Sequence, residues 1–125
     1  MLCDRFSDAT LAYQGYGRGL DTDLIRQLNT VATAGLQPDL TLLLDFPVAV
    51  GLNRARQRNA GCDGPDEGRF EAEALEFHER VRSGYLLLAA SEPRIHVADA
   101  EGEPATVAAR IDAVVTPLLA VRRPA

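Results

Sequence analysis

The chain of 125 residues contains no lysine and no tryptophan, and all 13 of its basic side chains are arginines. The absence of lysine excludes, within these residues, the phosphate-binding loop that ends in Gly-Lys-Ser or Gly-Lys-Thr, because that loop places a lysine on the nucleotide phosphates. The net charge of -5 and the pI near 4.9 argue against a nucleic-acid interface, which needs clustered excess basic charge. We therefore expect no nucleic-acid partner.

Cysteine is also scarce, and long apolar runs are absent. Cys3 and Cys62 lie far apart, in no metal-ligand spacing and no Cys-x-x-Cys motif, which predicts two free thiols in a reducing compartment. No apolar run approaches the roughly 20 residues that a membrane helix requires. The residues after Met1 do not form a signal peptide. We expect a cytoplasmic protein that does not contact a membrane.

The residues that are present predict one domain with alternating strands and helices. Hydrophobic residues make up 46% and charged residues 25% of the chain, as in soluble globular proteins. The apolar runs predict strands, and repeats at helical spacing predict helices. In 70–90 the repeat places five apolar residues on one stripe: Ala74, Phe77, Val81, Tyr85 and Leu88. The predicted strands are the tail at 1–3, a strand buried on both faces at 40–46, and 95–98; the predicted helices are 21–34, one opening at Pro47, 70–90, and one from Pro104 ending in a frayed 122–124. This order indicates an α/β fold with a parallel sheet.

The charged pair Asp4-Arg5 directly follows the first predicted strand. Loops at the carboxyl ends of parallel strands bind ligands. An arginine offers a planar fork that grips phosphate with two hydrogen bonds. An aspartate can accept a hydrogen bond from a ligand hydroxyl or hold a water on Mg²⁺. The alternative is a charged turn in which Asp4 and Arg5 simply pair with each other.

The stretch around this pair resembles the Asp-Arg-Tyr segment of thymidylate kinases, in its order Asp4-Arg5-Phe6-Ser7-Asp8 followed by Ala12-Tyr13-Gln14-Gly15. Smaller motifs follow in the family's order, through Pro38-Asp39-Leu40-Thr41, Arg54-Ala55-Arg56, Arg69-Phe70-Glu71, Phe77, Tyr85 and Val97-Ala98-Asp99-Ala100. The resemblance implies the P-loop nucleoside monophosphate kinase fold. It also implies that residues 1–125 form a single partial domain, in which the N-terminal strands and the P-loop are missing.

The same resemblance implies an activity and an acceptor site. Thymidylate kinases transfer the γ-phosphoryl group of ATP, with Mg²⁺, to dTMP. Arg5 would grip the dTMP phosphate, and Asp4 would lie near that phosphate and the metal. Thr10 would lie near the thymine base, Tyr13 beside the deoxyribose, and Gln14 in the wall of the same pocket. The alternative for Tyr13 is an ordinary core aromatic.

The same resemblance implies where ATP, the phosphate donor, would bind. Three glycines and a proline at 59–68 predict a mobile loop, and the resemblance makes 59–70 the lid. Arg69 would reach the ATP phosphates, and Arg58 would lie near the adenine. The alternative for the arginines at 54, 56 and 58 is a solvated helix face. The resemblance further implies a homodimer packed through helices.

One alternative function remains open on the sequence. The segment that would carry the P-loop amounts to roughly 80–100 residues, the size of two βα units and a strand. Without it, the strand at 40–46 would expose an apolar edge, and we expect the chain alone to be poorly stable or to pair with another segment. The alternative to a thymidylate kinase is then a truncated, non-catalytic nucleotide-binding or dimerisation remnant.

Overall fold

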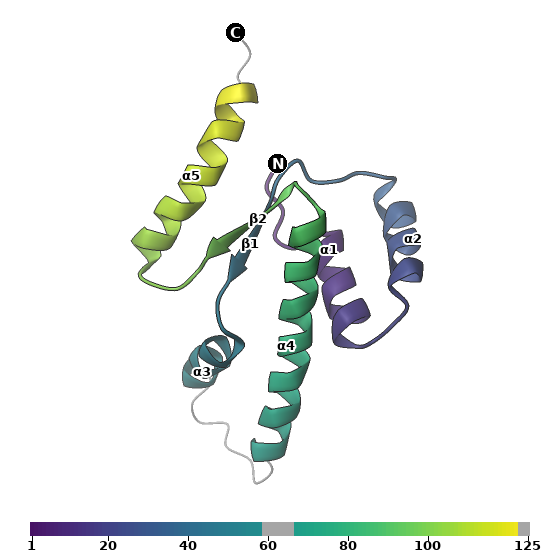
Figure 1. Cartoon of the computed structure of the whole chain (residues 1–125), viewed down its shortest axis with the longest axis vertical. Helices are drawn as coiled ribbons and strands as arrows, with labels where there is room; N and C mark the ends of the chain where they lie inside the picture. Colours follow the sequence, from purple (N-terminus) through teal and green to yellow (C-terminus); the bar gives the residue numbers. More distant parts are fainter. Residues whose placement is uncertain (59–66, 123–125) are drawn as a thin grey trace.

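The computed structural model describes residues 1–58 and 67–122, and for 67–72 and 122 it describes the backbone only. The elements follow the predicted order of helices and strands along the chain (Figure 1). They are α1 (Ser7–Thr10), the π-helix η1 (Leu11–Gly17), α2 (Thr22–Thr33), β1 (Thr41–Asp45), α3 (Val48–Arg58), α4 (Glu67–Ser91), β2 (Ile95–Asp99) and α5 (Pro104–Arg122).

The two strands pair in parallel, which confirms the α/β class with a parallel sheet. Their register runs from Thr41 opposite Ile95 to Asp45 opposite Asp99. The prediction that 40–46 is buried on both faces is wrong for this structure, because no residue of β1 is fully buried and Leu44 is 48% exposed. Among the described residues, only β2 pairs with β1, so the apolar edge expected for this strand is open.

Three predicted boundaries differ from the structure. Residues 1–3 form no strand and are exposed, because no strand lies beside them in the described part of the chain. The predicted lid, 59–70, is not a loop throughout. Its residues 59–66 lie outside the described part, and from Glu67 the backbone is the first turn of α4. Arg122 still belongs to α5 rather than to a frayed tail.

The ends of α2 are determined by local chemistry that is visible in the sequence. The Asp21 carboxylate accepts hydrogen bonds from the N–H groups of Asp23 (2.9 Å) and Leu24 (3.4 Å), which satisfies two donors that a helix start leaves free. At the other end, Ala34 and Gly35 adopt positive φ angles of 52° and 76°. This left-handed turn ends the helix, and glycine is the residue that favours it.

The core lies where η1, α2, α4 and β2 meet. Leu11, Ile25, Leu88 and Ile95 form its buried cluster, one residue from each of these elements. The predicted apolar stripe of the long helix is confirmed at Val81 and Leu88, which are 4% and 2% exposed. In Figure 1, α4 separates η1 and α2 on one side from the sheet and α5 on the other.

Helix α5 is the least covered element of the described chain. It contacts β2, and Leu119 and Val121 on its distal half are 58% and 84% exposed. By length and composition alone, its 18 residues Pro104–Val121 could cross a membrane. Core helices of soluble proteins meet the same criterion when a further layer covers them, so the feature is weak evidence for a membrane.

Candidate functional site

The Asp4-Arg5 turn holds an arginine in an uncommon backbone conformation. The φ angle of Arg5 is +61°, in the left-handed region. A non-glycine residue held there costs about 1–3 kcal/mol, and it persists only where the surrounding structure fixes it; such residues concentrate at functional sites. The Arg5 carbonyl accepts a hydrogen bond from the Cys3 thiol at 3.3 Å. Arg5 itself is exposed, so its guanidinium is accessible to a ligand.

The Arg5 guanidinium lies over the ring of Tyr13. The distance from its central carbon to the ring centroid is 5.3 Å, within the range of a cation–π contact. The alternative in which Arg5 simply pairs with Asp4 is not what the structure shows, because the partner that Arg5 faces is Tyr13. Two of the predicted acceptor-site residues therefore lie together.

Tyr13 and Gln14 are carried by η1, a π-helix of seven residues. Such segments are rare and are frequently found at functional sites. Thr10 lies on the turn just before η1 and is exposed, whereas Tyr13 and Gln14 are half-buried. The segment thus presents three of the predicted acceptor-site residues within little more than one turn.

Two glycines allow η1 to lie unusually close to α4. A Cβ atom on Gly84 would be 2.6 Å from the side chain of Tyr16, and one on Gly17 would be 2.8 Å from the ring of Phe77. Neither distance is compatible with a larger residue without movement of the neighbour. The Arg80 side chain then donates a hydrogen bond from Nε to the Gly17 carbonyl at 3.0 Å, which fixes the last turn of η1 to α4.

The ring of Tyr13 packs against two aromatic side chains of α4. Its centroid lies 6.0 Å from that of Phe77 and 6.4 Å from that of Tyr85, in tilted and edge-on geometries that favour aromatic pairs. Tyr13 is therefore packed as a core aromatic on the side that contacts α4, and Arg5 lies over its ring. Its predicted place beside a deoxyribose stays a prediction. The stripe of α4 predicted Phe77 and Tyr85 as core residues; nothing in the sequence indicated that they support Tyr13.

Tyr85 is electrostatically coupled to the same site. Burial raises the pKa of Tyr85 above its ordinary value, nearby Tyr13 and Asp8 add to this increase, and the positive charge of Arg5 opposes it. The hydroxyl of Tyr85 is therefore neutral over the whole physiological pH range, and it senses the charges of Arg5 and Asp8.

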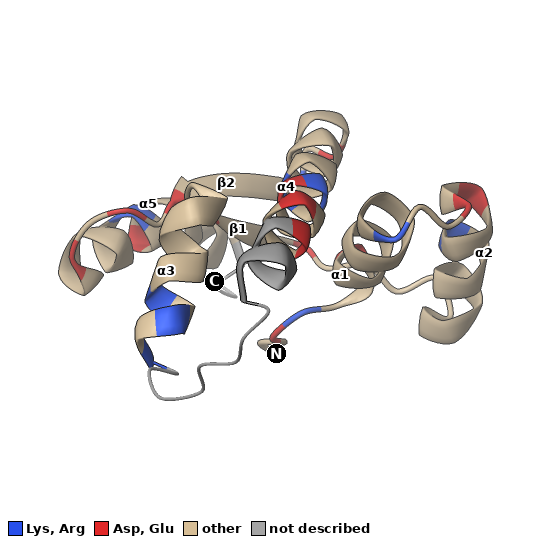
Figure 2. Cartoon of the chain, turned by 90° about the horizontal axis from the view of Figure 1, so that it is seen from below, with Lys and Arg blue, Asp and Glu red and all other residues tan. Residues whose placement is uncertain are grey.

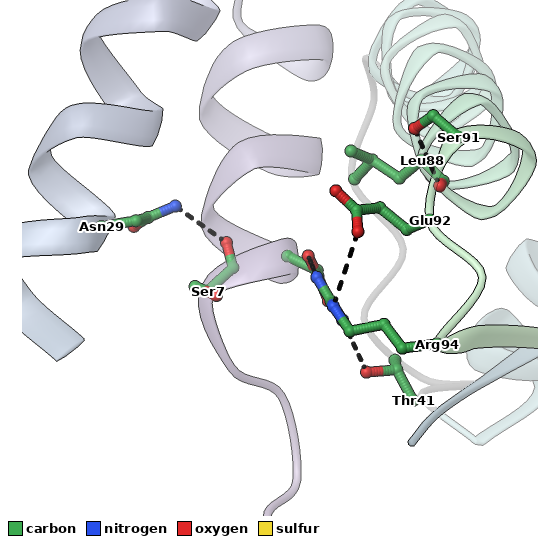
Figure 3. Close-up of polar contacts among 8 residues, drawn as sticks. Ser7, Asn29, Thr41, Leu88, Ser91, Glu92 and Arg94 are labelled. Atoms are coloured by element: carbon green, nitrogen blue, oxygen red, sulfur yellow. Dashed lines mark hydrogen bonds and ion pairs between the residues drawn. The ribbon is translucent and has the colours of Figure 1, made fainter. Parts of the chain in front are cut away.

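A hydrogen-bonded ion pair that the sequence analysis missed holds α1 in place. Arg94 donates two hydrogen bonds of 2.8 Å to the Asp8 carboxylate and one of 3.0 Å to the Thr41 hydroxyl (Figure 3). The side chains of Arg94 and Asp8 are only 15% and 13% exposed. The hydrogen bonds to Asp8 raise the pKa of Arg94, which stays charged. No spacing or pattern relates residue 94 to residue 8, so only the fold could reveal this pair.

The predicted donor-side residues lie apart from the acceptor site. Arg58 is the last residue of α3, an exposed position, and α3 lies on the opposite side of α4 from η1 (Figures 1 and 2). Arg54 and Arg56 belong to the same helix, and Arg54 lies over the ring of Phe46 at 5.4 Å. Arg69 lies in the first turns of α4, and its side chain is outside what the structure describes.

The residues of this site are compatible with Mg²⁺ held chiefly by a nucleotide. Among the described residues, no three His, Cys, Asp or Glu side chains come together in a way that could hold a metal ion. In nucleotide enzymes, Mg²⁺ usually keeps several waters and binds one or two carboxylates together with the substrate phosphates. The exposed carboxylate of Asp4, adjacent to Arg5, can supply such a contact.

Comparison with known proteins gives a consistent result. A model of the family described as thymidylate kinase matches residues 1–111. The chain is 57% identical over 122 residues to a protein named thymidylate kinase from Trichlorobacter lovleyi, covering 97% of this chain and 58% of that protein. It is 58% identical to the thymidylate kinase of Solidesulfovibrio magneticus, over 95% of this chain and 58% of that protein. It is 61% identical to the thymidylate kinase of Desulfovibrio desulfuricans, over 86% of this chain and 50% of that protein.

The chain therefore spans somewhat more than half the length of the relatives it matches most extensively. The match includes the Asp4-Arg5 turn, η1 and all of α4, so it covers every element that carries a predicted acceptor-site residue or packs against one. With a family match over most of its residues and identities near 60%, the chain belongs to the thymidylate kinase family.

Proposed function

We propose that the complete protein to which this chain belongs phosphorylates dTMP to dTDP with ATP. The observation that carries this proposal is the position of Arg5 over Tyr13, on a strained turn that leads into a π-helix. Phosphoryl transfer depends mainly on positioning and on electrostatic stabilisation of the transferred group. An accessible guanidinium beside an aromatic ring suits a ligand that has an anionic phosphate and a flat sugar or base.

In this proposal, each acceptor-site residue has one role. Arg5 binds the phosphate of dTMP with its guanidinium fork, and Tyr13 packs beside the deoxyribose, where its contacts with α4 keep the ring in place. Thr10 lies near the thymine base, and Gln14 lines the same pocket. Asp4 accepts a hydrogen bond from the acceptor or from a water on the metal. Mg²⁺ would neutralise charge on the nucleotide phosphates.

On the donor side, we propose that 59–70 acts as a lid on the ATP phosphates. Arg69 supplies positive charge there, and Arg58 contacts the adenine. The remaining ATP-binding groups, including a P-loop, would come from outside these 125 residues, consistent with the coverage of only 58% of the first relatives. Residues 1–125 are then one partial domain of the kinase.

We also propose a cytoplasmic homodimer. Helix α2 and its flanks carry an exposed apolar stripe, formed by Leu20, Leu24, Leu28, Val31 and Leu36, which are between 53% and 81% exposed. A face of this kind on a soluble protein marks an interaction surface. The apolar surface of α5 is covered by protein rather than by lipid in this proposal. Light scattering on the complete protein measures its oligomeric state and so tests the homodimer.

The experiment that tests the activity uses the complete product of the gene. ADP release with dTMP as acceptor should proceed at a rate typical of kinases, about 1–100 per second. Arg5→Ala should lower kcat/KM for dTMP by about 10²–10³, because it removes a charged group that holds the phosphate. The matched control is Arg18→Ala, an exposed arginine at the end of η1, which should stay within about threefold of wild type.

Two outcomes would contradict the proposal. If the wild-type protein released no ADP with dTMP, the non-catalytic remnant would be the better description. If Arg5→Ala turned over dTMP as well as Arg18→Ala does, the protein would be a kinase whose acceptor site lies elsewhere.

A further inference from the structure

The conformation of Arg5 requires support from its neighbours. Its φ angle of +61° is uncommon for an arginine. Its side chain is exposed, so the contact of the guanidinium with Tyr13 and the hydrogen bond from Cys3 give the turn only weak support. The segment must therefore be fixed at the residues that flank it. On the C-terminal side these are Ser7 and Asp8, in the first turn of α1.

Two elements far apart in the sequence hold this first turn. The Asn29 side chain of α2 donates a hydrogen bond to the Ser7 carbonyl at 3.1 Å. From the other side, Arg94 makes the two-bonded ion pair with Asp8 and also binds Thr41 at the start of β1 (Figure 3). The turn that carries Arg5 is thereby fixed to α2 and to the beginnings of both strands.

Arg94 is suited to this role by geometry and burial. A guanidinium that makes two parallel hydrogen bonds to a carboxylate fixes orientation as well as distance. The side chains of this salt bridge are only 13–15% exposed, so solvent and salt screen it far less than a salt bridge on the surface. Among the described residues, the other acid that forms an ion pair with Arg94 is Glu92, at 3.9 Å from Nε, so Asp8 is the main partner.

We propose that Arg94 is a positioning residue for dTMP: through Asp8 it fixes the first turn of α1, and thereby the guanidinium of Arg5 and the ring of Tyr13. The inference rests on the proposed function, since it concerns the same acceptor site. Arg94 touches no substrate in this account. Its effect should therefore appear as weaker use of dTMP, with the use of ATP unchanged.

The chain offers a matched control for this inference. Arg82 of α4 makes the same two-bonded contact with Asp45, at 2.8 and 3.0 Å. Its side chain and that of Asp45 are 34% and 20% exposed. This pair joins α4 to the end of β1 and does not involve α1. Loss of Arg82 thus removes an ion pair of the same two-bonded form, though a more exposed one, without releasing the turn that carries Arg5.

The test compares Arg94→Met, Arg94→Lys and Arg82→Met in the complete protein. For each variant, KM for dTMP, KM for ATP, kcat and the thermal midpoint are measured. Arg94→Met should raise KM for dTMP at least tenfold and leave KM for ATP within twofold. Arg94→Lys, which keeps the charge but not the fork, should recover part of this loss. Arg82→Met should lower the thermal midpoint and leave both KM values within twofold.

Three results would overturn the inference. In the first, Arg94→Met lowers the thermal midpoint and leaves KM for dTMP unchanged, which assigns Arg94 a purely structural role. In the second, both KM values rise equally. In the third, Arg82→Met raises KM for dTMP as much as Arg94→Met does. If Arg94→Met does not fold, Asp8→Asn, which nearly keeps the side-chain volume, is held to the same criteria. Absence of dTMP turnover in the wild type would instead contradict the proposed function, and the inference with it.

Discussion

The two sides of α4 differ in how closely their elements are packed. On one side, η1 approaches α4 so closely that Gly17 and Gly84 leave no space for a Cβ atom, and the rings of Tyr13, Phe77 and Tyr85 fill the contact. On the other side, two short strands and α5 leave Leu44 and Leu119 48% and 58% exposed.

This difference separates the contact of η1 with α4, which the described residues complete, from the sheet and α5, which they leave open. The proposed acceptor site depends on side-chain placement, and it lies where the described residues determine that placement by themselves. The sheet and α5 carry apolar surface that needs a further layer. The chain covers only 58% of its first relatives, and so a covering segment in the complete protein is our expectation.

The largest expected effect comes from truncating one leucine in the packed region of α4 and one on the exposed face of α5. Leu88→Ala removes a side chain that is 2% exposed, and Leu119→Ala removes one that is 58% exposed. In the 125-residue chain, Leu88→Ala should lower the free energy of unfolding by about 2–5 kcal/mol. Leu119→Ala should stay within about 0.5 kcal/mol. Urea unfolding measures both, and equal losses would show that α5 is as well packed as α4.

The same pair of variants also tests whether a further segment covers α5 in the complete protein. In the complete protein, the loss from Leu119→Ala should rise toward the value for Leu88→Ala if an additional segment covers α5. A loss that stayed near zero would instead leave this face of α5 open in the complete protein.

A second test acts on the close approach of η1 and α4. Gly84→Ala places a methyl group 2.6 Å from Tyr16 and should destabilise the fold by about 1–3 kcal/mol, despite the better helix propensity of alanine. The control is Ser83→Ala at the exposed neighbouring position of the same helix, which should be neutral or slightly stabilising. Thermal unfolding measures both. A stabilising Gly84→Ala would mean that η1 does not lie against α4 as described.

The smallest expected effect concerns pH. The raised pKa of Tyr85 means that the folded protein keeps the phenol proton to a higher pH than the unfolded chain does. Stability is therefore fully present below about pH 10, the usual pKa of tyrosine, and falls as the pH rises above it. Tyr85→Phe should flatten this decline between pH 9 and 11 and change stability at pH 7 by less than about 0.5 kcal/mol. Parallel pH profiles for the two proteins would contradict the assignment.

The order of elements could be predicted from the sequence because it depends on local signals. Asp21 and Gly35 mark the ends of α2 through capping chemistry, and the stripe of α4 predicts Val81 and Leu88 as buried. The prediction that β1 is buried on both faces is wrong because burial, unlike the order of elements, is not a local property. A run of leucines predicts burial in a complete sheet, and its actual exposure depends on which neighbours are present.

The details of the candidate site were less predictable. The pairing of Arg5 with phosphate came from a resemblance, and its role remains a prediction. Neither the left-handed turn at Arg5 nor the π-helix has a local sequence signal. The residues beside them are bonded to distant elements, Ser7 to Asn29 and Gly17 to Arg80. Arg94 lies directly before β2, and only the fold brings it to Asp8.

The late pairing of β1 with β2 has a consequence during protein synthesis. The only described partner of β1, which is β2, begins at Ile95, after both α3 and α4 have been made. At about 5–20 residues per second, the ribosome exposes β1 for several seconds before β2 emerges. During that interval its leucines are available to other nascent chains, and so rapid engagement by a chaperone should matter more for this segment than for the helices that flank it.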